Sequence, residues 1–257
     1  MANYHSAGAT IRALLARLEK AATPDDKARL MDALTHPARP IVVSFLNAHA
    51  VNLAVNDPTF AAALIGSDYL LRDGGGVKIG CKMFSIAPGI NLNGTDLIPE
   101  LFARFGGRRV ALIGAEPEWL ARTHALLKEA NYGFSALDAV DGFRAESVYL
   151  DFVRTKAPEL IVLGLGMPRQ EQLAQKLRAL MAESGTPATI VNGGAIIDFL
   201  AGKFPRAPLW MRKGGIEWLY RLSREPRRLA KRYVLGNPLF LARVLVARLV
   251  APPQVTL

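Results

Sequence analysis

The chain has 257 residues, of which 51% are hydrophobic, and it carries a formal net charge of +10 and a single cysteine, Cys81. This composition can bury a large core, and one cysteine excludes both a disulfide framework and a multi-cysteine zinc site. It also fits a reducing compartment. The N-terminal residues lack the pattern of a secretion signal, and no stretch reaches the ~20 uncharged apolar residues that span a bilayer. We therefore expect no signal peptide and no transmembrane helix.

Residues 1–39 predict an N-terminal helical extension. An apolar stripe runs along its first part, made of Ile11, Leu14, Leu15 and Leu18. Thr23-Pro24-Asp25-Asp26 is typical of a turn that opens a second helix. The extension is either a helical cap on the following domain or a loosely attached segment.

Residues 40–205 predict an α/β core domain. Short apolar runs are expected to form strands at Ile41–Leu46, Arg109–Gly114, Leu160–Gly164 and Thr189–Asn192, with helices at 51–65, 117–130 and 170–184. Continuous apolar strands that alternate with helices indicate a mainly parallel, Rossmann-like sheet with helices on both faces. Ligands bind such sheets at the carboxyl ends of the strands, so the residues after each strand are the candidate site residues.

Asp73 is the candidate catalytic residue. It precedes a run of glycines, and we expect Gly74 and Gly76 to let the backbone approach a substrate closely. A carboxylate there can act as a general base that deprotonates an acceptor hydroxyl, as glycosyl transfer requires. An ordinary Asp-Gly turn would also explain the pattern.

The first strand is followed by Asn47 and His49, which can bind sugar hydroxyls, although His49 also fits a partly buried structural histidine. With four histidines and no spaced cluster, we expect no metal site.

The second predicted strand ends at Gly114, where backbone N–H groups can face a diphosphate; a tight turn is the simpler explanation. After the fourth strand, Gly193 and Asp198 are expected to line the same crevice. Asp198 also fits an acidic residue near a helix N-terminus.

The third predicted strand ends in a glycine-rich turn at Gly164 and Gly166, which permits close backbone approach to a ligand. Three polar residues then open a helix. Arg169 can pair with a phosphate, and the Gln170 amide suits recognition of a base or sugar. A solvated helix start, with Glu171 favourable to the helix dipole, explains the same residues.

Residues 206–257 form a basic, amphipathic appendage. Two acidic residues oppose eleven basic ones, giving +9 of the total charge: Arg206, Arg212, Lys213, Arg221, Arg224, Arg227, Arg228, Lys231, Arg232, Arg243 and Arg248. Such a cluster predicts an anionic partner, and interfacial aromatic and aliphatic residues favour a membrane surface. A basic helix that covers the protein's own core is the other interpretation, and we expect both to apply in part.

Taken in order, these motifs resemble the WecG/TagA/CpsF glycosyltransferase family. The resemblance runs from Asn47 to Tyr233 and leaves out the first 40 residues. Its matching elements are Asn47, Asp73-Gly74-x-Gly76, Gly94-Thr95-Asp96-Leu97, Gly164-x-Gly166-x-Pro168-x-Gln170-Glu171, Gly193-Gly194 with Asp198, Arg206-Ala207-Pro208, Gly215-Ile216-Glu217-Trp218-Leu219-Tyr220-Arg221-Leu222 and Glu225-Pro226-x-Arg228.

The resemblance implies an inverting, metal-independent enzyme without a cofactor. It would move a sugar from a UDP-sugar to a polyprenyl-diphosphate-linked acceptor in polysaccharide synthesis. Its location would be cytoplasmic and peripheral, on the inner face of the plasma membrane. The resemblance makes Asp73 the base, places Asn47 beside a sugar, and assigns Gln170 and Asp198 to the crevice. Among the appendage arginines, it points to Arg206, Arg221 and Arg228 as neighbours of the UDP diphosphate.

One position departs from the family pattern. Many members carry an arginine where this chain has Asn91, three residues before Gly94. We expect Asn91, Asn93 and Asp96 to contact substrate, and the lost charge favours a neutral donor, such as a UDP-glucose or UDP-N-acetylmannosamine type, over a uronic acid.

Two other classes of protein share parts of this pattern. A nucleic-acid-binding protein would explain the basic appendage, but no RNA-binding motif is present and we expect no nucleic acid partner. A nucleotide-dependent oxidoreductase would share the α/β pattern, but the chain lacks the dinucleotide glycine fingerprint. A homo-oligomer is compatible with the sequence.

Overall fold

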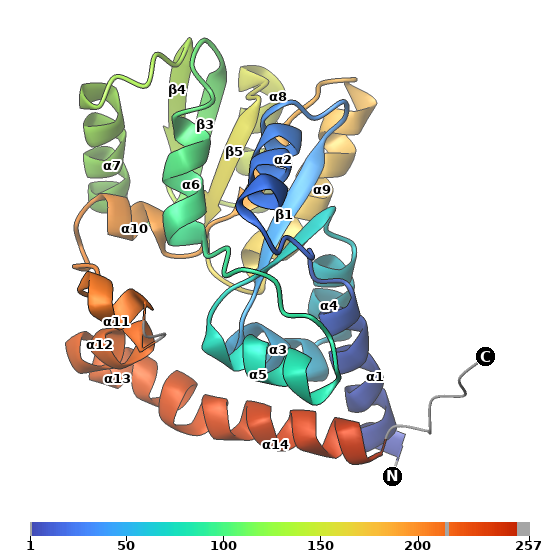
Figure 1. Cartoon of the computed structure of the whole chain (residues 1–257). Helices are drawn as coiled ribbons and strands as arrows, with labels where there is room; N and C mark the ends of the chain where they lie inside the picture. Colours follow the sequence, from blue (N-terminus) through green and yellow to red (C-terminus); the bar gives the residue numbers. More distant parts are fainter. Residues whose placement is uncertain (1, 214–215, 251–257) are drawn as a thin grey trace.

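The computed structural model describes residues 2–213 and 216–250, and its centre is a six-stranded sheet in the order β2-β1-β6-β5-β3-β4 (Figure 1). Every pairing between neighbouring strands is parallel. The strands are β1 Ile41–Leu46, β2 Tyr69–Arg72, β3 Arg109–Gly114, β4 Ala136–Val140, β5 Leu160–Gly164 and β6 Thr189–Asn192. The predicted α/β class with a parallel sheet is confirmed.

Helices cover both faces of this sheet and one of its ends (Figure 1). They are α1 Ala2–Ala16, α2 Pro24–Thr35, α3 Ala48–Asn56, α4 Pro58–Ile65, α5 Gly75–Met83, α6 Gly94–Phe102, α7 Pro117–Glu129, α8 Glu146–Lys156, α9 Arg169–Glu183, α10 Ile196–Leu200, α11 Leu209–Lys213, α12 Glu217–Arg224, α13 Pro226–Ala230, the π-helix η1 Lys231–Leu235 and α14 Gly236–Leu249.

Three apolar clusters hold these layers together. One face of the sheet packs against α2, α6, α7 and α10. The other face packs against α8 and α9. The strands supply alternate residues to the two faces, so Val43 joins the first cluster and Val42 the second, as pleated strands require. A third cluster unites α1, α3, α4, α5 and α14.

The N-terminal segment packs as a cap. Its predicted apolar stripe on α1 is buried against α3 and α14. The backbone after α1 joins the edge of the sheet, because the Glu19 N–H donates to Leu70 O at 2.8 Å. Thr23 and Asp26 form a reciprocal capping box at the start of α2, as the turn motif predicts.

The four predicted strands have the expected bounds, but the predicted helix at 51–65 is wrong in one respect. It is two helices, α3 and α4, separated at Asp57. The Asp57 side chain accepts a hydrogen bond from the Phe60 N–H, and Pro58 begins the new helix. An N-cap followed by proline starts a helix more readily than it continues one.

The C-terminal segment is helical without interruption from Pro226 to Leu249. The sequence Gly236-Asn237-Pro238 does not break it, because the π-turn η1 absorbs the irregularity, with the Gly236 N–H bonded to Lys231 O. α14 then runs beneath α3 and α5 to reach α1 (Figure 1). Gly215 of the closing motif and residues 251–257 lie outside the described residues.

Within the described residues, no helix has both the length and the apolar character needed to cross a membrane.

Candidate active site

Asp73 and Asn47 meet where β1 and β2 end side by side. The Asp73 N–H donates to Leu46 O at 2.9 Å, which joins the two strand ends. Asn47 Nδ2 donates to Asp73 Oδ2 at 3.2 Å, while Asn47 Oδ1 accepts from the Ala50 N–H at 3.0 Å and caps α3. The cap fixes which end of the Asn47 amide faces Asp73. The half-buried carboxylate is thus held by one oxygen, and no hydrogen bond from the described residues engages its Oδ1.

Arg72 and Asn91 hold the turn that carries Asp73. The buried Arg72 guanidinium donates to Pro88 O at 2.8 Å, Gly89 O at 3.0 Å and Gly74 O at 3.1 Å. Asn91 Oδ1 accepts from the Gly74 N–H at 2.8 Å. Many members of the family have an arginine at the position of Asn91. Here the Asn91 side chain stabilises the turn through its hydrogen bond from the Gly74 N–H. Arg72 was not among the predicted site residues, although a charged residue at the end of an apolar strand is a signal of such a role.

Gly74 and Gly76 shape the same turn in different ways. Gly74 has φ +90°, a conformation that L side chains rarely adopt, and the space around its absent side chain is open. Gly76 lies against Ala48 and Phe240, so α5 approaches α3 and α14 closely there.

His49 lies in the first turn of α3 and faces Arg232 of η1. Burial, assisted by the positive charge of Arg232, lowers the pKa of His49 to about 4, so its imidazole is neutral near pH 7. Arg232 is itself largely desolvated, which lowers its pKa, while the charges of Tyr233 and Asp73 act in the opposite direction. Within the part of the chain that the structure describes, its buried Nε has no hydrogen-bond partner. The appendage thus brings a cation near the Asp73 carboxylate, and nothing in the local sequence distinguishes Arg232 from its basic neighbours.

Asp96 gathers a second group of cations at the start of α6. Asn93 caps this helix and donates Nδ2 to Asp96 Oδ2 at 2.7 Å. Arg206 Nη2 lies 2.8 Å and Arg212 Nη1 lies 3.8 Å from Asp96 Oδ1. Burial alone would raise the pKa of Asp96, but the Asn93 hydrogen bond and Arg206 outweigh it and hold this pKa below its usual value.

The two arginines beside Asp96 keep unused donors. Among the described residues, Arg206 Nε and Arg212 Nε are buried without a hydrogen-bond partner, and Arg206 Nη2 contacts Asp96 as an ion pair without hydrogen-bond alignment. Buried N–H groups without acceptors are costly, so these atoms suit an anionic ligand.

Asp198 belongs to a third group, where α10 meets α12 and α13. Its Oδ1 lies 3.3 Å from Lys203 Nζ, which also pairs with Glu116 at 3.2 Å. Arg221 stacks 4.5 Å from the centre of the Phe199 ring. Arg228 lies 5.5 Å from the Phe204 ring centre and pairs with Glu225 at 2.6 Å. Cation–π contacts therefore attach the appendage to the core at this point.

Three of the predicted site glycines lie where the protein packs against itself. A side chain on Gly114 would come within 2.4 Å of the Gly164 backbone on the neighbouring strand. One on Gly164 would meet Ile197 at 2.7 Å, and one on Gly193 would meet Ile196 at 2.4 Å. Gly166, with φ +76°, has open space around it. Among these four residues, Gly166 has room for a ligand beside its backbone.

Arg169, Gln170 and Glu171 are committed to contacts within the protein. Arg169 donates to Gly142 O at 2.9 Å and Arg144 O at 2.8 Å, which holds the loop after β4. Gln170 and Glu171 are both 0% exposed. Burial raises the pKa of Glu171 to about 7. Their assignment to the substrate remains a prediction.

Residues 14–253 match the glycosyl transferase WecG/TagA/CpsF family. The chain belongs to this family. It is therefore a glycosyltransferase of cell-surface polysaccharide synthesis. The match begins at residue 14, within α1, so the expectation that the first 40 residues lie outside the family is wrong for residues 14–40. The reason is visible in the fold, because α1 is part of the same buried cluster as α3, α5 and α14.

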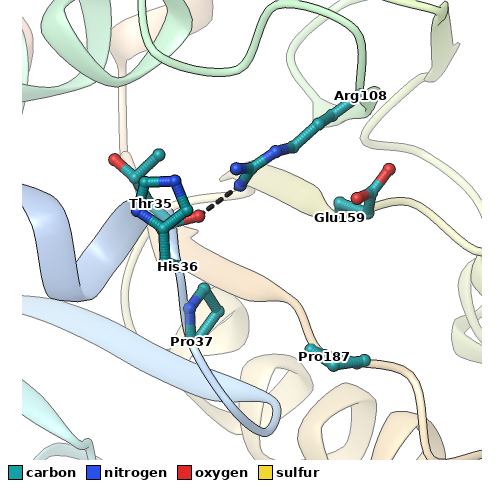
Figure 2. Close-up of a pocket in the computed structure, with 6 residues that line it drawn as sticks. All are labelled: Thr35, His36, Pro37, Arg108, Glu159 and Pro187. Carbon is teal, nitrogen blue, oxygen red and sulfur yellow. Dashed lines mark hydrogen bonds between the residues drawn. The ribbon is translucent and has the colours of Figure 1, made fainter.

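A hollow in this glycosyltransferase lies at the opposite end of the sheet. It has a volume of about 270 Å³ and is lined by Thr35, His36, Pro37, Arg108, Glu159 and Pro187, which precede β1, β3, β5 and β6 (Figure 2). Arg108 donates to Thr35 O across it. Because parallel sheets bind ligands at their carboxyl ends, the hollow is not the candidate site.

Among the described residues of this glycosyltransferase, no group of three or more His, Cys, Asp and Glu side chains is arranged to hold a metal ion. The polar groups that converge at the strand ends are instead arginines, amides and single carboxylates.

Proposed function

We propose that the chain transfers a sugar from a UDP-sugar to a polyprenyl-diphosphate-linked acceptor, with inversion and without a metal ion. Asp73 removes the proton from the acceptor hydroxyl, and that oxygen attacks the anomeric carbon. The bond from this carbon to the UDP oxygen breaks, and the diphosphate departs with the electron pair. The observation that carries this proposal is the Asn47 hydrogen bond to Asp73, which holds one carboxylate oxygen and leaves the other to accept a proton.

Arginines of the appendage support the departure of UDP. Arg206 and Arg212 present buried donors without aligned acceptors, and Arg232 does the same near Asp73. Diphosphate oxygens are strong acceptors for such groups, and fixed positive charge stabilises the negative charge that develops in the transition state. These residues supply the charge that a divalent cation provides in metal-dependent transferases.

The donor is proposed to carry a neutral sugar. The Asn91 side-chain carbonyl accepts a hydrogen bond from the Gly74 N–H, and the Arg72 guanidinium donates to backbone carbonyls. Asn91 is uncharged, and the Arg72 guanidinium is already engaged by the backbone, so neither residue can pair with a uronic acid carboxylate. A UDP-glucose or UDP-N-acetylmannosamine type of donor fits this environment.

The surface around α14 is proposed to rest on the cytoplasmic face of an anionic membrane. One side of α14 packs on the core through Phe240, Val244 and Ala247. Its exposed side carries Leu245 and Leu249, and α11 exposes Trp210. α5 packs beside α14 and adds exposed Ile79, Lys78 and Lys82. Apolar side chains flanked by lysines and arginines bind interfaces through combined burial and charge attraction.

The test is UDP release from a set of UDP-sugars with a polyprenyl-diphosphate-sugar acceptor. Asp73→Asn should abolish release while the protein stays folded, and a chelator should leave the wild-type rate unchanged. Asp151→Asn makes the same chemical change at an exposed acid on α8 and serves as the control. Turnover that survives in Asp73→Asn would remove Asp73 from its role, and loss of activity on chelation would refute metal independence.

A further inference from the structure

One side chain joins the turns that follow two neighbouring strands. Gln170 Oε1 accepts hydrogen bonds from the Gly166 N–H at 3.2 Å and from the Gly194 N–H at 3.1 Å. Gly166 follows β5 and Gly194 follows β6, so a single amide oxygen bridges the carboxyl ends of adjacent strands. Gln170 is fully buried, and the contact is shielded from water.

Glu171 fixes the direction of that amide. Gln170 Nε2 donates to Glu171 Oε1 at 2.8 Å, so the Gln170 oxygen must face the two turns. A reversed amide would place its NH₂ group against two N–H donors and away from its acceptor. Glu171 Oε2 is buried and has no hydrogen-bond partner in residues 2–213 and 216–250, an arrangement that costs stability rather than adding to it.

Both turns lie at the carboxyl ends of the strands, where parallel sheets bind their ligands. Gly166 and Gly194 have φ values of +76° and +60°, and neither has a neighbour within 4 Å of its absent side chain. The turn after β6 continues directly into α10 and so sets the position of Asp198. A shift of this turn relative to β5 would therefore move the wall of the site, although Gln170 itself is sealed from solvent.

We propose that Gln170 and Glu171 are a positioning pair for the transfer reaction. Gln170 holds the turns after β5 and β6 at a fixed separation, and Glu171 sets the orientation of the Gln170 amide. The pair acts through the two turns and does not touch the substrate. This inference rests on the proposed function.

Exchanging the two side chains tests the pair. In Gln170→Glu the two turn N–H groups keep an acceptor, but the donor to Glu171 is lost and two buried carboxyls become neighbours. In the double variant, which combines Gln170→Glu with Glu171→Gln, the new amide at position 171 can donate to the new carboxylate at position 170, so the connection is rebuilt in reverse. We expect the single variant to lose about 100-fold in kcat with little change in donor KM, since small displacements of a positioned group cost rates of this order. The exchange should recover most of that loss.

The readouts separate this inference from the proposed function. Turnover is followed as UDP release, and the Gly166 and Gly194 amides are followed by NMR hydrogen exchange. Recovery of both kcat and amide protection in the exchanged pair supports the inference. Protected amides with unrecovered kcat would overturn it, because Gln170 would then act on substrate directly or serve folding alone. Unprotected amides in the wild type would also overturn it.

If the wild type released no UDP with any donor, the proposed function would fall, while the amide exchange would still report on the bridge. If Gln170→Glu does not fold, Gln170→Asn takes its place. Its shorter amide cannot reach both turns, so it should lose protection at one turn amide together with kcat. Wild-type kcat in this variant would contradict the inference.

Discussion

Asn47 Nδ2 lies 3.2 Å from Asp73 Oδ2, and the same side chain caps α3 through its Oδ1. One residue therefore starts a helix and orients the proposed base. The two roles can be separated, because serine is a good N-cap but is too short to reach Asp73.

Asn47→Ser should keep the stability of the protein within about 0.5 kcal/mol while it lowers turnover. Asn47→Ala should lower both stability and turnover, with a stability cost of about 1 kcal/mol from the missing cap. Urea unfolding and UDP release measure the two effects. Equal turnover in Asn47→Ser and the wild type would show that the hydrogen bond from Asn47 to Asp73 does not contribute to catalysis.

Arg232 links the appendage to His49 and Asp73, so its removal should act on both. Arg232→Gln should raise the pKa of His49 from about 4, because the repelling charge disappears, and should reduce kcat by about 100-fold if Arg232 stabilises the leaving diphosphate. An NMR titration of the imidazole measures the first change. Arg224→Gln, at an exposed position on α12, is the control and should change neither. A His49 pKa unmoved by Arg232→Gln would refute their coupling.

The raised pKa of Glu171 predicts that the free energy of unfolding falls as pH rises. Its pKa is raised from 4.5 to about 7, so the folded state holds the proton more tightly than the unfolded state does. The contribution of Glu171 to the free energy of unfolding is complete below about pH 4.5 and is lost as pH rises through 7. The total change is on the order of 3 kcal/mol, at about 1.4 kcal/mol per unit of pKa.

Glu171→Gln should therefore flatten the dependence of the unfolding free energy on pH in this window. Glu183→Gln, at an exposed position near the end of the same helix, should leave the dependence as in the wild type. Urea unfolding between pH 4.5 and 8 measures both. A wild-type slope that persists in Glu171→Gln would assign the effect to another group.

Membrane binding should depend on single exposed side chains of α14. Leu245→Glu should weaken binding to anionic liposomes, whereas Leu126→Glu on α7 should not, although Leu126 is similarly exposed at 41%. Lys78→Gln/Lys82→Gln on α5 should weaken binding by about 1 kcal/mol per lysine at low salt. Liposome sedimentation measures each variant. Equal binding by the wild type and Leu245→Glu would remove α14 from the interface. Substitution is a sharper test than removal of the segment, because α14 also buries Phe240 in the core.

The sequence predicted those parts of the fold in which one local signal dominates. The four predicted strands were found because their apolar runs are continuous and bounded by turns. β2 was missed because it ends in the charged residue Arg72, and β4 because it is half-buried along its length. The π-turn η1 has no distinct signal in the sequence, although it lets the helix continue through Gly236-Asn237-Pro238.

The candidate site was less predictable than the fold. Asp73 and Asn47 each follow a strand, but their contact depends on the pairing of β1 with β2. No local sequence pattern predicts which strands are neighbours in the sheet. The Gln170 bridge joins Gly166 to Gly194, and the partner at Gly194 is visible only once β5 and β6 are paired. Arg232 reaches His49 from the far end of the chain, where eleven basic residues look alike in sequence.

The packing of α1 on α14 has a consequence for biosynthesis. Arg12 Nη1 donates to Ala247 O at 3.1 Å, and Gly8 lies against Ala247, so the first helix finds part of its partner surface in the last. A ribosome has to synthesise the chain as far as Ala247 before that surface exists. Until then Phe240 and Val244 cannot close over α5, and the floor beneath the Asp73 turn stays open. The enzyme is therefore expected to become competent for transfer only after α14 has been synthesised and has packed on α1 and α5.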